Sequence, residues 1–389
     1  MNILLIGFEH EIDFVCQTIK NRAYIKETVL WDKNGGPDCL TYEFLSQFDC
    51  IIIAVKDSET SEDLFTLISL IRDDDSHNID FYRLYQACIP FMKADRIMTN
   101  HPERKYDGMI LGISHAEVGL IPRCFDGNFC NLAVTSQDIY FNLKTLEYCL
   151  ANYPEKISNL KYLILDLYDY TYFNYDTSLT KNVANYYAMG GYIAAHNLDR
   201  NKHFRVSFET VIADIFADRF HGVTDSMASL WNELFPDIYA QYDYLEFPFI
   251  TTTYLRTKMI QDKDIEKYYA NTSIVEKIFH NTIQENIQHF YALLDLAYRI
   301  APQIKIYLIL LPRNFQAQQK GNALYPQYAQ WKEMFETILE EANKIYPFTY
   351  LNFKDHGISK EMKYYYDVSH FNYYGAVTFS KLLNNMIKN

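Results

Sequence analysis

Short apolar runs, each followed by a segment with helical spacing, constrain the fold of this chain more than any other feature. Near the N-terminus we expect strands at residues 2–6, 28–32 and 50–55, and helices at residues 12–20 and 61–72. Apolar strands of this kind are typical of parallel sheets that are covered by helices on both faces. The region therefore predicts half of a doubly wound α/β sheet.

The same alternation returns further along the chain. Strands are expected at residues 162–167, 305–311 and 348–351, and helices at residues 281–299 and 326–344. This order predicts a parallel sheet with helices on both faces. The carboxyl ends of its strands would lie at one edge, where active sites of such sheets open.

A chain of 389 residues, of which 49% are hydrophobic, is long enough for two domains. We expect a small Rossmann-like α/β domain at residues 1–100 and a larger α/β domain at residues 101–389. Residues 176–280 lack the strand-helix rhythm and are rich in aromatic residues, which predicts a mostly helical insertion. Insertions at the carboxyl end of a parallel sheet tend to form substrate lids.

The expected N-terminal domain lacks most of the signature of a nucleotide site. Asp32, after the second strand, could hold a ribose hydroxyl, but the first turn contains one glycine, Gly7. The carboxylates of Glu9 and Glu11 in that turn would repel a pyrophosphate. We therefore expect a Rossmann-like domain without a cofactor.

Charge and cysteine content argue against several classes of partner. A formal net charge of -13 without a basic stripe argues against nucleic acid and anionic membranes. The acidic run at residues 73–80 is interpreted as a solvated loop and not a metal site, because its carboxylates have no fixed spacing. The 7 cysteines are odd in number and show no C-x-x-C spacing, which favours reduced thiols over disulfides or zinc.

No export or anchoring signal is visible in the sequence. Residues 1–7 are too short for the apolar core of a signal peptide, and no stretch reaches the length of a transmembrane segment. We expect a cytoplasmic protein.

Ser114 is a candidate nucleophile. It lies in the turn LGISHAEVGL, after an apolar strand and just before a helix that can open at Ala116. Gly112 allows the tight turn, and the unpaired amides at the start of the helix can receive a developing oxyanion. The alternative is that Ser114 serves only as the N-cap of that helix.

The segment YYYDVSHFNYYGAVTFSKLL carries the partners that a serine nucleophile needs. His370 can take the proton of the serine, and Asp367 can orient the imidazole. The alternatives are that His370 is an ordinary surface or core histidine and that Asp367 caps the final helix, expected at residues 375–383. We expect His370 and Ser114 to meet at one edge of the sheet.

The pattern of Asp367, His370, Asn372 and Gly375 before the final helix resembles the last block of the SGNH (GDSL-like) hydrolase superfamily. The resemblance extends from about residue 106 to the C-terminus and is closest to the polysaccharide and cell-wall acyltransferase branch. That branch includes the D-alanyl transfer proteins of lipoteichoic acid and the alginate-type O-acetyltransferases. The resemblance implies that Ser114 is the nucleophile, His370 the base and Asp367 its orienting carboxylate.

Two further blocks of the superfamily can be compared with this chain. Residues 131–150 look like the second block, and the resemblance implies oxyanion or substrate binding at Ser136 and Gln137, one of which stands where the superfamily usually has glycine. The third block, often Gly-x-Asn-Asp, is absent. Asp166, Asp169 and Asn174 follow the corresponding strand, so the third oxyanion donor is not identified.

Two functions are consistent with these features. The first is an O-acetyltransferase or O-acetylesterase that acts on a bacterial surface carbohydrate or its precursor, without a metal or redox cofactor. The second is a glycan-locus binding or scaffold protein in which the three residues persist only as structure. The 34 tyrosines suit sugar recognition, although a coding bias towards Tyr, Asn, Lys and Ile explains them equally well.

Overall fold

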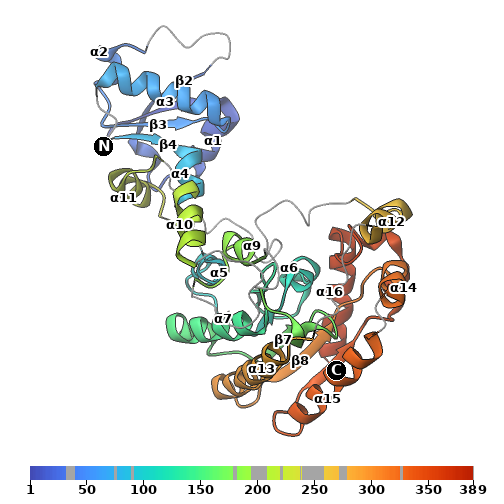
Figure 1. The fold of residues 1–389 in the computed structure, drawn as a ribbon. Helices are drawn as coiled ribbons and strands as arrows, with labels where there is room; N and C mark the ends of the chain where they lie inside the picture. Colours follow the sequence, from blue (N-terminus) through green and yellow to red (C-terminus); the bar gives the residue numbers. More distant parts are fainter. Residues whose placement is uncertain are drawn as a thin grey trace. The chain divides into compact units, whose positions relative to one another are not determined.

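The computed structural model describes residues 1–31, 40–73, 77–88, 92–177, 182–193, 208–219, 222–236, 238, 258–270, 278–324 and 327–388. Within these residues the chain is α/β and forms two sheets of parallel strands (Figure 1). It divides into two compact units. One contains Met1–Pro90 and Ile212–Gln241, and the other contains Phe91–Val211 and Tyr242–Asn389.

The first unit is built on a four-stranded sheet in the order β2-β1-β3-β4. Its strands are β1 (Ile3–Gly7), β2 (Ile25–Leu30), β3 (Cys50–Ala54) and β4 (Asn78–Asp80). One face packs against α1 (Glu9–Thr18), α4 (Phe81–Ala87) and α11 (Asp225–Leu234). The other packs against α2 (Tyr42–Leu45) and α3 (Ser58–Arg72). Alternation of side chains along β1 explains both layers, because Leu5 joins the first cluster and Leu4 the second.

The interpretation of residues 73–80 as a solvated loop is wrong for the end of this run. Its last three residues form β4, in which Ile79 is fully buried and Asp80 is 9% exposed. Asp80 caps α4 by accepting a hydrogen bond of 3.2 Å from the Arg83 amide. The carboxylate therefore lies at a helix start, where the unpaired amides favour an acceptor. Residues 74–76 and Asp32 lie outside the described residues.

The second unit contains a five-stranded sheet in the order β6-β5-β7-β8-β9. Its strands are β5 (Gly108–Leu111), β6 (Phe129–Asn131), β7 (Tyr162–Asp166), β8 (Lys305–Leu310) and β9 (Thr349–Asn352). One face is covered by α5 (Lys93–Asn100), α7 (Ile139–Asn152), α8 (Pro154–Ile157), α13 (His280–Ile300) and α15 (Tyr328–Asn343). The other is covered by α6 (Ser114–Gly119), α14 (Phe315–Leu324) and α16 (Tyr373–Ile387).

The expected insertion at residues 176–280 is helical over much of its described part, but its helices join different cores. It contains α9 (Asn182–Ala188), α10 (Phe208–Arg219), α11 and α12 (Asp262–Ala270). Trp231 of α11 packs 5.1 Å from Phe81 in the first unit, whereas Ile265 of α12 joins a core cluster of the second. The first unit therefore includes a segment, Ile212–Gln241, that was expected in the second domain. Hydrophobic periodicity predicts that a helix forms, but it does not show which core the helix joins.

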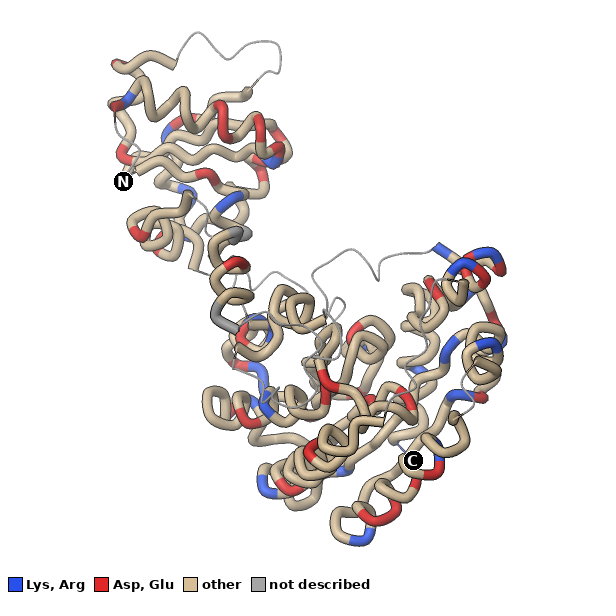
Figure 2. Tube along the Cα trace, in the orientation of Figure 1, with Lys and Arg blue, Asp and Glu red and all other residues tan. Residues whose placement is uncertain are grey.

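Charged residues of both signs are interspersed along the chain (Figure 2). Among the described residues, no helix is both long and apolar enough to cross a membrane. No group of three or more His, Cys, Asp or Glu side chains in the described part is placed to hold a metal ion.

Candidate active site

Ser114 lies at a strand-to-helix turn that requires glycine. Gly112 follows β5 with φ +141°, and a Cβ atom there would lie 2.7 Å from the Cβ of Asp166. Its amide donates a 2.8 Å hydrogen bond to Asn142 Oδ1. Helix α6 begins at Ser114 itself, and its N-cap is Ile113. Ser114 is therefore not the N-cap, and its half-buried hydroxyl is available for another contact.

His370 and Asp367 lie on a short loop that is closed at its base. Tyr365 and Phe371 form an antiparallel bridge, and the His370 carbonyl accepts a hydrogen bond from the Tyr366 amide. Asn372 then caps α16, because its Oδ1 accepts a 3.0 Å hydrogen bond from the Gly375 amide. The cap of the final helix is thus Asn372 and not Asp367.

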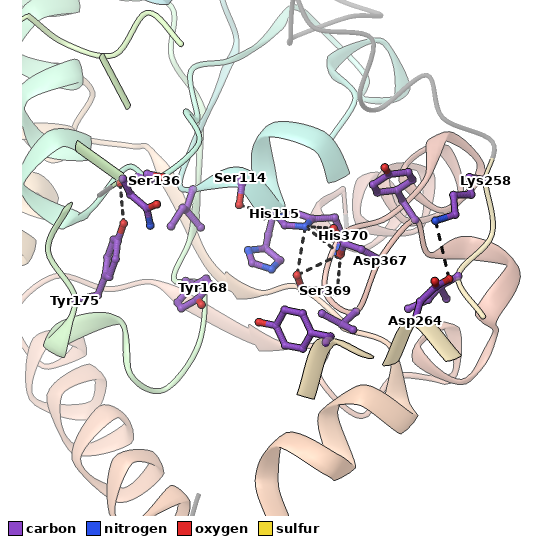
Figure 3. Close-up of a pocket in the computed structure, with 16 residues that line it drawn as sticks. Ser114, His115, Ser136, Tyr168, Tyr175, Lys258, Asp264, Asp367, Ser369 and His370 are labelled. Atoms are coloured by element: carbon purple, nitrogen blue, oxygen red, sulfur yellow. Dashed lines mark hydrogen bonds and ion pairs between the residues drawn. The ribbon is translucent and has the colours of Figure 1, made fainter. Parts of the chain in front are cut away.

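The structure brings Ser114, His370 and Asp367 together in one hydrogen-bonded chain (Figure 3). Ser114 Oγ lies 2.8 Å from His370 Nε2, and His370 Nδ1 lies 2.9 Å from Asp367 Oδ2. The side chains of His370 and Asp367 are 27% and 42% exposed. The expected meeting of Ser114 and His370 is confirmed.

The surroundings of Asp367 keep its carboxyl ionised. Burial alone would raise its pKa, but the hydrogen bond and charge of His370 and the amides of Ser369 and His370 outweigh burial and lower the pKa to about 2. The two amide bonds, from Ser369 and His370 to Asp367 Oδ1, measure 2.9 and 2.8 Å. Asp367 can therefore act as a fixed acceptor for the imidazole.

His115 stacks on His370. The ring centroids are 4.5 Å apart, the rings are inclined by 18°, and His115 is 5% exposed. Neither ring nitrogen of His115 has a hydrogen-bond partner among the described residues. Burial lowers the pKa of His115 well below its usual range, and His370, Arg313 and Lys354 lower it further. His115 is thus a neutral ring that supports one face of His370.

Of the two residues expected to bind an oxyanion or substrate, Ser136 faces the site and Gln137 does not. Ser136 lines the cavity beside Ser114 and has φ +67°, in the left-handed region that favours glycine. No hydrogen bond joins its amide to the described residues. Gln137 is fully buried, and its side chain donates a 2.6 Å hydrogen bond to Asn142 Oδ1. Its amide is bound to the Val134 carbonyl at 2.9 Å.

Tyr168 reaches the cavity from the segment after β7, where the sequence lacks a third block. It has φ +61°, and its carbonyl accepts a 3.1 Å hydrogen bond from Arg313 Nη2. Asp169 instead forms half-buried ion pairs with Arg313 at 3.0 Å and Lys354 at 2.6 Å. Asn174 Oδ1 accepts the Phe279 amide at 2.7 Å. Tyr168 could not be predicted from the sequence, because no motif marks a tyrosine at this turn.

Asp166, the last residue of β7, is a buried acid beneath the Ser114 turn. Its Oδ1 accepts a 3.0 Å hydrogen bond from the Tyr168 amide, and its Oδ2 has no partner among the described residues. Burial raises the pKa of Asp166 to about 7, although hydrogen bonds and Arg313 oppose the shift. Asp166 does not line the cavity.

The cavity beside Ser114 has a volume of about 410 Å³, and four tyrosines are among the residues that line it. They are Tyr168, Tyr175, Tyr268 and Tyr366. Lys258 and Asp264 also line it and approach each other to 3.9 Å. Described parts of the expected insertion therefore contribute to the wall. The aromatic segment at residues 239–256 lies outside the described residues.

No family model matches the chain, and no curated protein matches it. Among solved structures, the chain is similar to one described as "a putative platelet activating factor from Streptococcus pneumonia". The sequence identity is 12%, the TM-score is 0.37, and the match covers 76% of this chain and 90% of that chain.

Proposed function

We propose that this protein is a serine-dependent acyl-transfer enzyme of the SGNH type, with Ser114 as nucleophile, His370 as base and Asp367 as orienting carboxylate. The observation that carries the proposal is the Ser114–His370–Asp367 hydrogen-bonded chain at the wall of a cavity. We further propose that the first unit is Rossmann-like. A parallel sheet with helices on both faces supports this assignment, and its order β2-β1-β3-β4 is that of the flavodoxin-like variant of doubly wound sheets.

The chemistry follows from the roles of the three residues. Ser114 Oγ attacks the acyl carbon while His370 Nε2 takes its proton, and the ionised Asp367 stabilises the imidazolium. The amides of Ser136 and of the start of α6 would bind the oxyanion. Collapse of the tetrahedral intermediate transfers the proton from His370 to the leaving oxygen. Water or a sugar hydroxyl then attacks the acyl-enzyme, giving its proton to His370, which returns it to Ser114.

We propose a carbohydrate as substrate, either as the acceptor of the acyl group or as the ester that is hydrolysed. Tyrosine rings can stack on the C–H faces of a sugar while their hydroxyls form hydrogen bonds. Four tyrosines line the cavity, and Tyr268 is 48% exposed. Residues of the insertion at the wall would limit access of water and favour transfer over hydrolysis.

A non-catalytic glycan-binding or scaffold role is the second candidate, and one observation favours it. Asp169 and Asn174, which follow the strand of the third block, are engaged in contacts away from the cavity. The third oxyanion donor is therefore absent from these two positions. A binding protein would retain the cavity but would not acylate Ser114.

The proposal is tested with an aryl acetate and a fluorophosphonate probe. Ser114→Ala should lower turnover by about 10³-fold or more and abolish labelling, with little change in Tm, because a half-buried hydroxyl contributes little to packing. Ser369→Ala is the matched control: Ser369 Oγ lies 3.3 Å from His370 Nδ1, but it should remain dispensable for labelling. Turnover by Ser114→Ala at the wild-type rate would mean that another nucleophile is responsible and would overturn the proposal. Absence of both turnover and labelling in the wild-type protein would leave the binding role.

A further inference from the structure

We propose that Glu117 and Lys93 form a buried latch that positions the Ser136 amide relative to Ser114 Oγ. The inference rests on the proposed function, because it concerns the oxyanion site of the same reaction. Glu117 is a positioning residue in this view, since it acts through the Thr135–Ser136 turn and does not itself line the cavity.

Glu117 connects the nucleophile helix to the neighbouring turn. It lies three residues after Ser114 in α6 and is fully buried. Its Oε2 accepts hydrogen bonds from the amide of Thr135 at 2.7 Å and from Thr135 Oγ1 at 2.6 Å. The residue that follows Thr135 is Ser136. Helix α6 therefore carries Ser114 at its first residue and, through Glu117 one helical turn later, binds the Thr135–Ser136 segment.

Lys93 completes the latch from α5. Its Nζ lies 2.9 Å from Glu117 Oε1, donates to the carbonyl of Ala133, and belongs to a side chain that is 3% exposed. The ammonium thus binds the same strand-to-turn segment on the side before Thr135. Both charges are buried and paired, and each binds the backbone of this segment.

The conformation of Ser136 explains why such a latch is needed. A non-glycine residue at φ +67° occupies a sparsely populated region, which persists only where surrounding contacts determine it. Glu117 and Lys93 hold the segment before Ser136, and Tyr175 Oη donates to the Ser136 carbonyl at 3.1 Å. A buried ion pair is a weak source of net stability compared with apolar residues of similar size. Apolar residues in place of Lys93 and Glu117 could stabilise the fold but could not bind this segment. We therefore assign to the ion pair the role of positioning the Ser136 amide.

The double variant Lys93→Met/Glu117→Leu tests this role. It replaces both charges by apolar side chains of similar size, so the fold and Tm should be largely retained. We expect kcat for the aryl acetate to fall about 10–100-fold, because displacement of an oxyanion donor costs transition-state stabilisation. KM should change less than about twofold, since ground-state binding does not use the oxyanion donor.

Thr135 provides a milder test if the double variant does not fold. Thr135→Val removes one bond to Glu117 and should lower kcat several-fold, whereas Thr135→Ser keeps both bonds and should retain the wild-type kcat. Thr145→Val is the matched control, because the Thr145 hydroxyl donates at 2.8 Å to the Phe141 carbonyl within α7. It should leave kcat unchanged.

The outcomes separate this inference from the proposed function. If Ser114→Ala is inactive but the folded double variant, or Thr135→Val, keeps the wild-type kcat, the latch has no positioning role and the inference is wrong. If Ser114→Ala remains active, the proposed function itself is wrong. A fall in kcat at constant KM, restored in Thr135→Ser, supports the latch.

Discussion

Asp166 is fully buried and Asp169 half-buried near the site, and their partners differ. Asp169 contacts Lys354 and Arg313, which outweigh the effect of burial and lower its pKa to about 2. Asp166 has no ion-pair partner among the described residues, and burial raises its pKa to about 7. The charged partner therefore decides which of these acids is ionised in the folded protein.

Asp166 should make stability depend on pH. Because burial raises the folded-state pKa above the ordinary value of 3.8, the folded protein binds more protons than the unfolded chain between pH 4 and 7. Its contribution to stability is full below pH 4 and is lost as the pH rises through 7. Between pH 5 and 8.5 this loss amounts to about 2–3 kcal/mol.

Asp166→Asn should remove the loss of stability that the ionisation of Asp166 causes between pH 5 and 8.5. Its free energy of unfolding, measured with urea at pH 5 and 8.5, should fall less with pH than that of the wild type. The asparagine Oδ1 can still accept the Tyr168 amide, so the comparison isolates the ionisation. Identical pH dependence in the two proteins would show that Asp166 does not titrate in this range.

Gly112→Ala should disturb the nucleophile turn. The added Cβ would meet Asp166 Cβ at 2.7 Å, and φ +141° is strained for alanine. We expect a loss of about 1–3 kcal/mol in unfolding free energy and a marked fall in aryl acetate turnover. Gly357→Ala is the control, because no atom lies within 4 Å of its Cβ position. Equal effects of the two substitutions would contradict the argument.

At the residue scale, the sequence predicted the residues that carry a local motif. Ser114, Asp367 and His370 were identifiable because each lies in a segment whose pattern is visible without the fold. Tyr168 and Lys258 were not, because they reach the cavity only after distant segments assemble. Gln137 was expected at the cavity but is buried, because adjacent residues in a turn point in different directions.

At the scale of elements, the loop that carries Asp367 and His370 depends on Asn372. The Asn372 side chain caps α16 through the Gly375 amide and also donates a 2.7 Å hydrogen bond to the Lys363 carbonyl. Its backbone amide donates to the Tyr364 carbonyl at 2.9 Å. One residue therefore fixes both the start of the helix and the base of the loop.

Asn372→Ala should weaken both the start of α16 and the base of the loop that carries His370. We expect stability to fall by about 1–2 kcal/mol through the lost cap, and kcat to fall because His370 is held less firmly. Asp57→Ala removes the cap of α3 in the first unit, where Asp57 Oδ1 accepts the Thr60 amide at 3.0 Å. It should destabilise the protein to a similar degree without changing kcat. If both variants keep the wild-type kcat, the cap does not position His370.

Most long elements could be predicted from the sequence. Short elements, and contacts between elements far apart in the chain, could not. The strand expected at residues 305–311 corresponds to β8, and the helix expected at residues 281–299 corresponds to α13. Strand β4 was missed because it has 3 residues within an acidic run. The partner of α11 could not be predicted, since its apolar face fits any core of suitable shape.

At the scale of the whole molecule, each unit has its own core clusters. Trp231 is fully buried with Phe81 and Phe235 in the first unit, at centroid distances of 5.1 and 4.7 Å. Ser114, His370, Asp367 and the cavity lie entirely in the second. A substitution that destabilises the core of the first unit should therefore leave the enzymatic activity of the second unit unchanged.

Trp231→Ala should destabilise the first unit by about 3–5 kcal/mol. Calorimetry should show one transition shifted to lower temperature, while the aryl acetate rate at 25 °C stays unchanged. Trp331→Ala, in a core cluster of the second unit, should shift a different transition and lower activity on heating. A loss of activity by Trp231→Ala at 25 °C would contradict the separation.

The first sheet is covered in part by α11, a helix from much later in the chain. On the ribosome, the strands of the first sheet emerge early, but the helix that supplies Trp231 begins only at Asp225. At ordinary rates of translation the interval is on the order of 10 s. During that time one apolar face of the nascent sheet, which includes Phe81, lacks part of its cover. The newly synthesised N-terminal segment should therefore be a binding target for chaperones until α11 arrives.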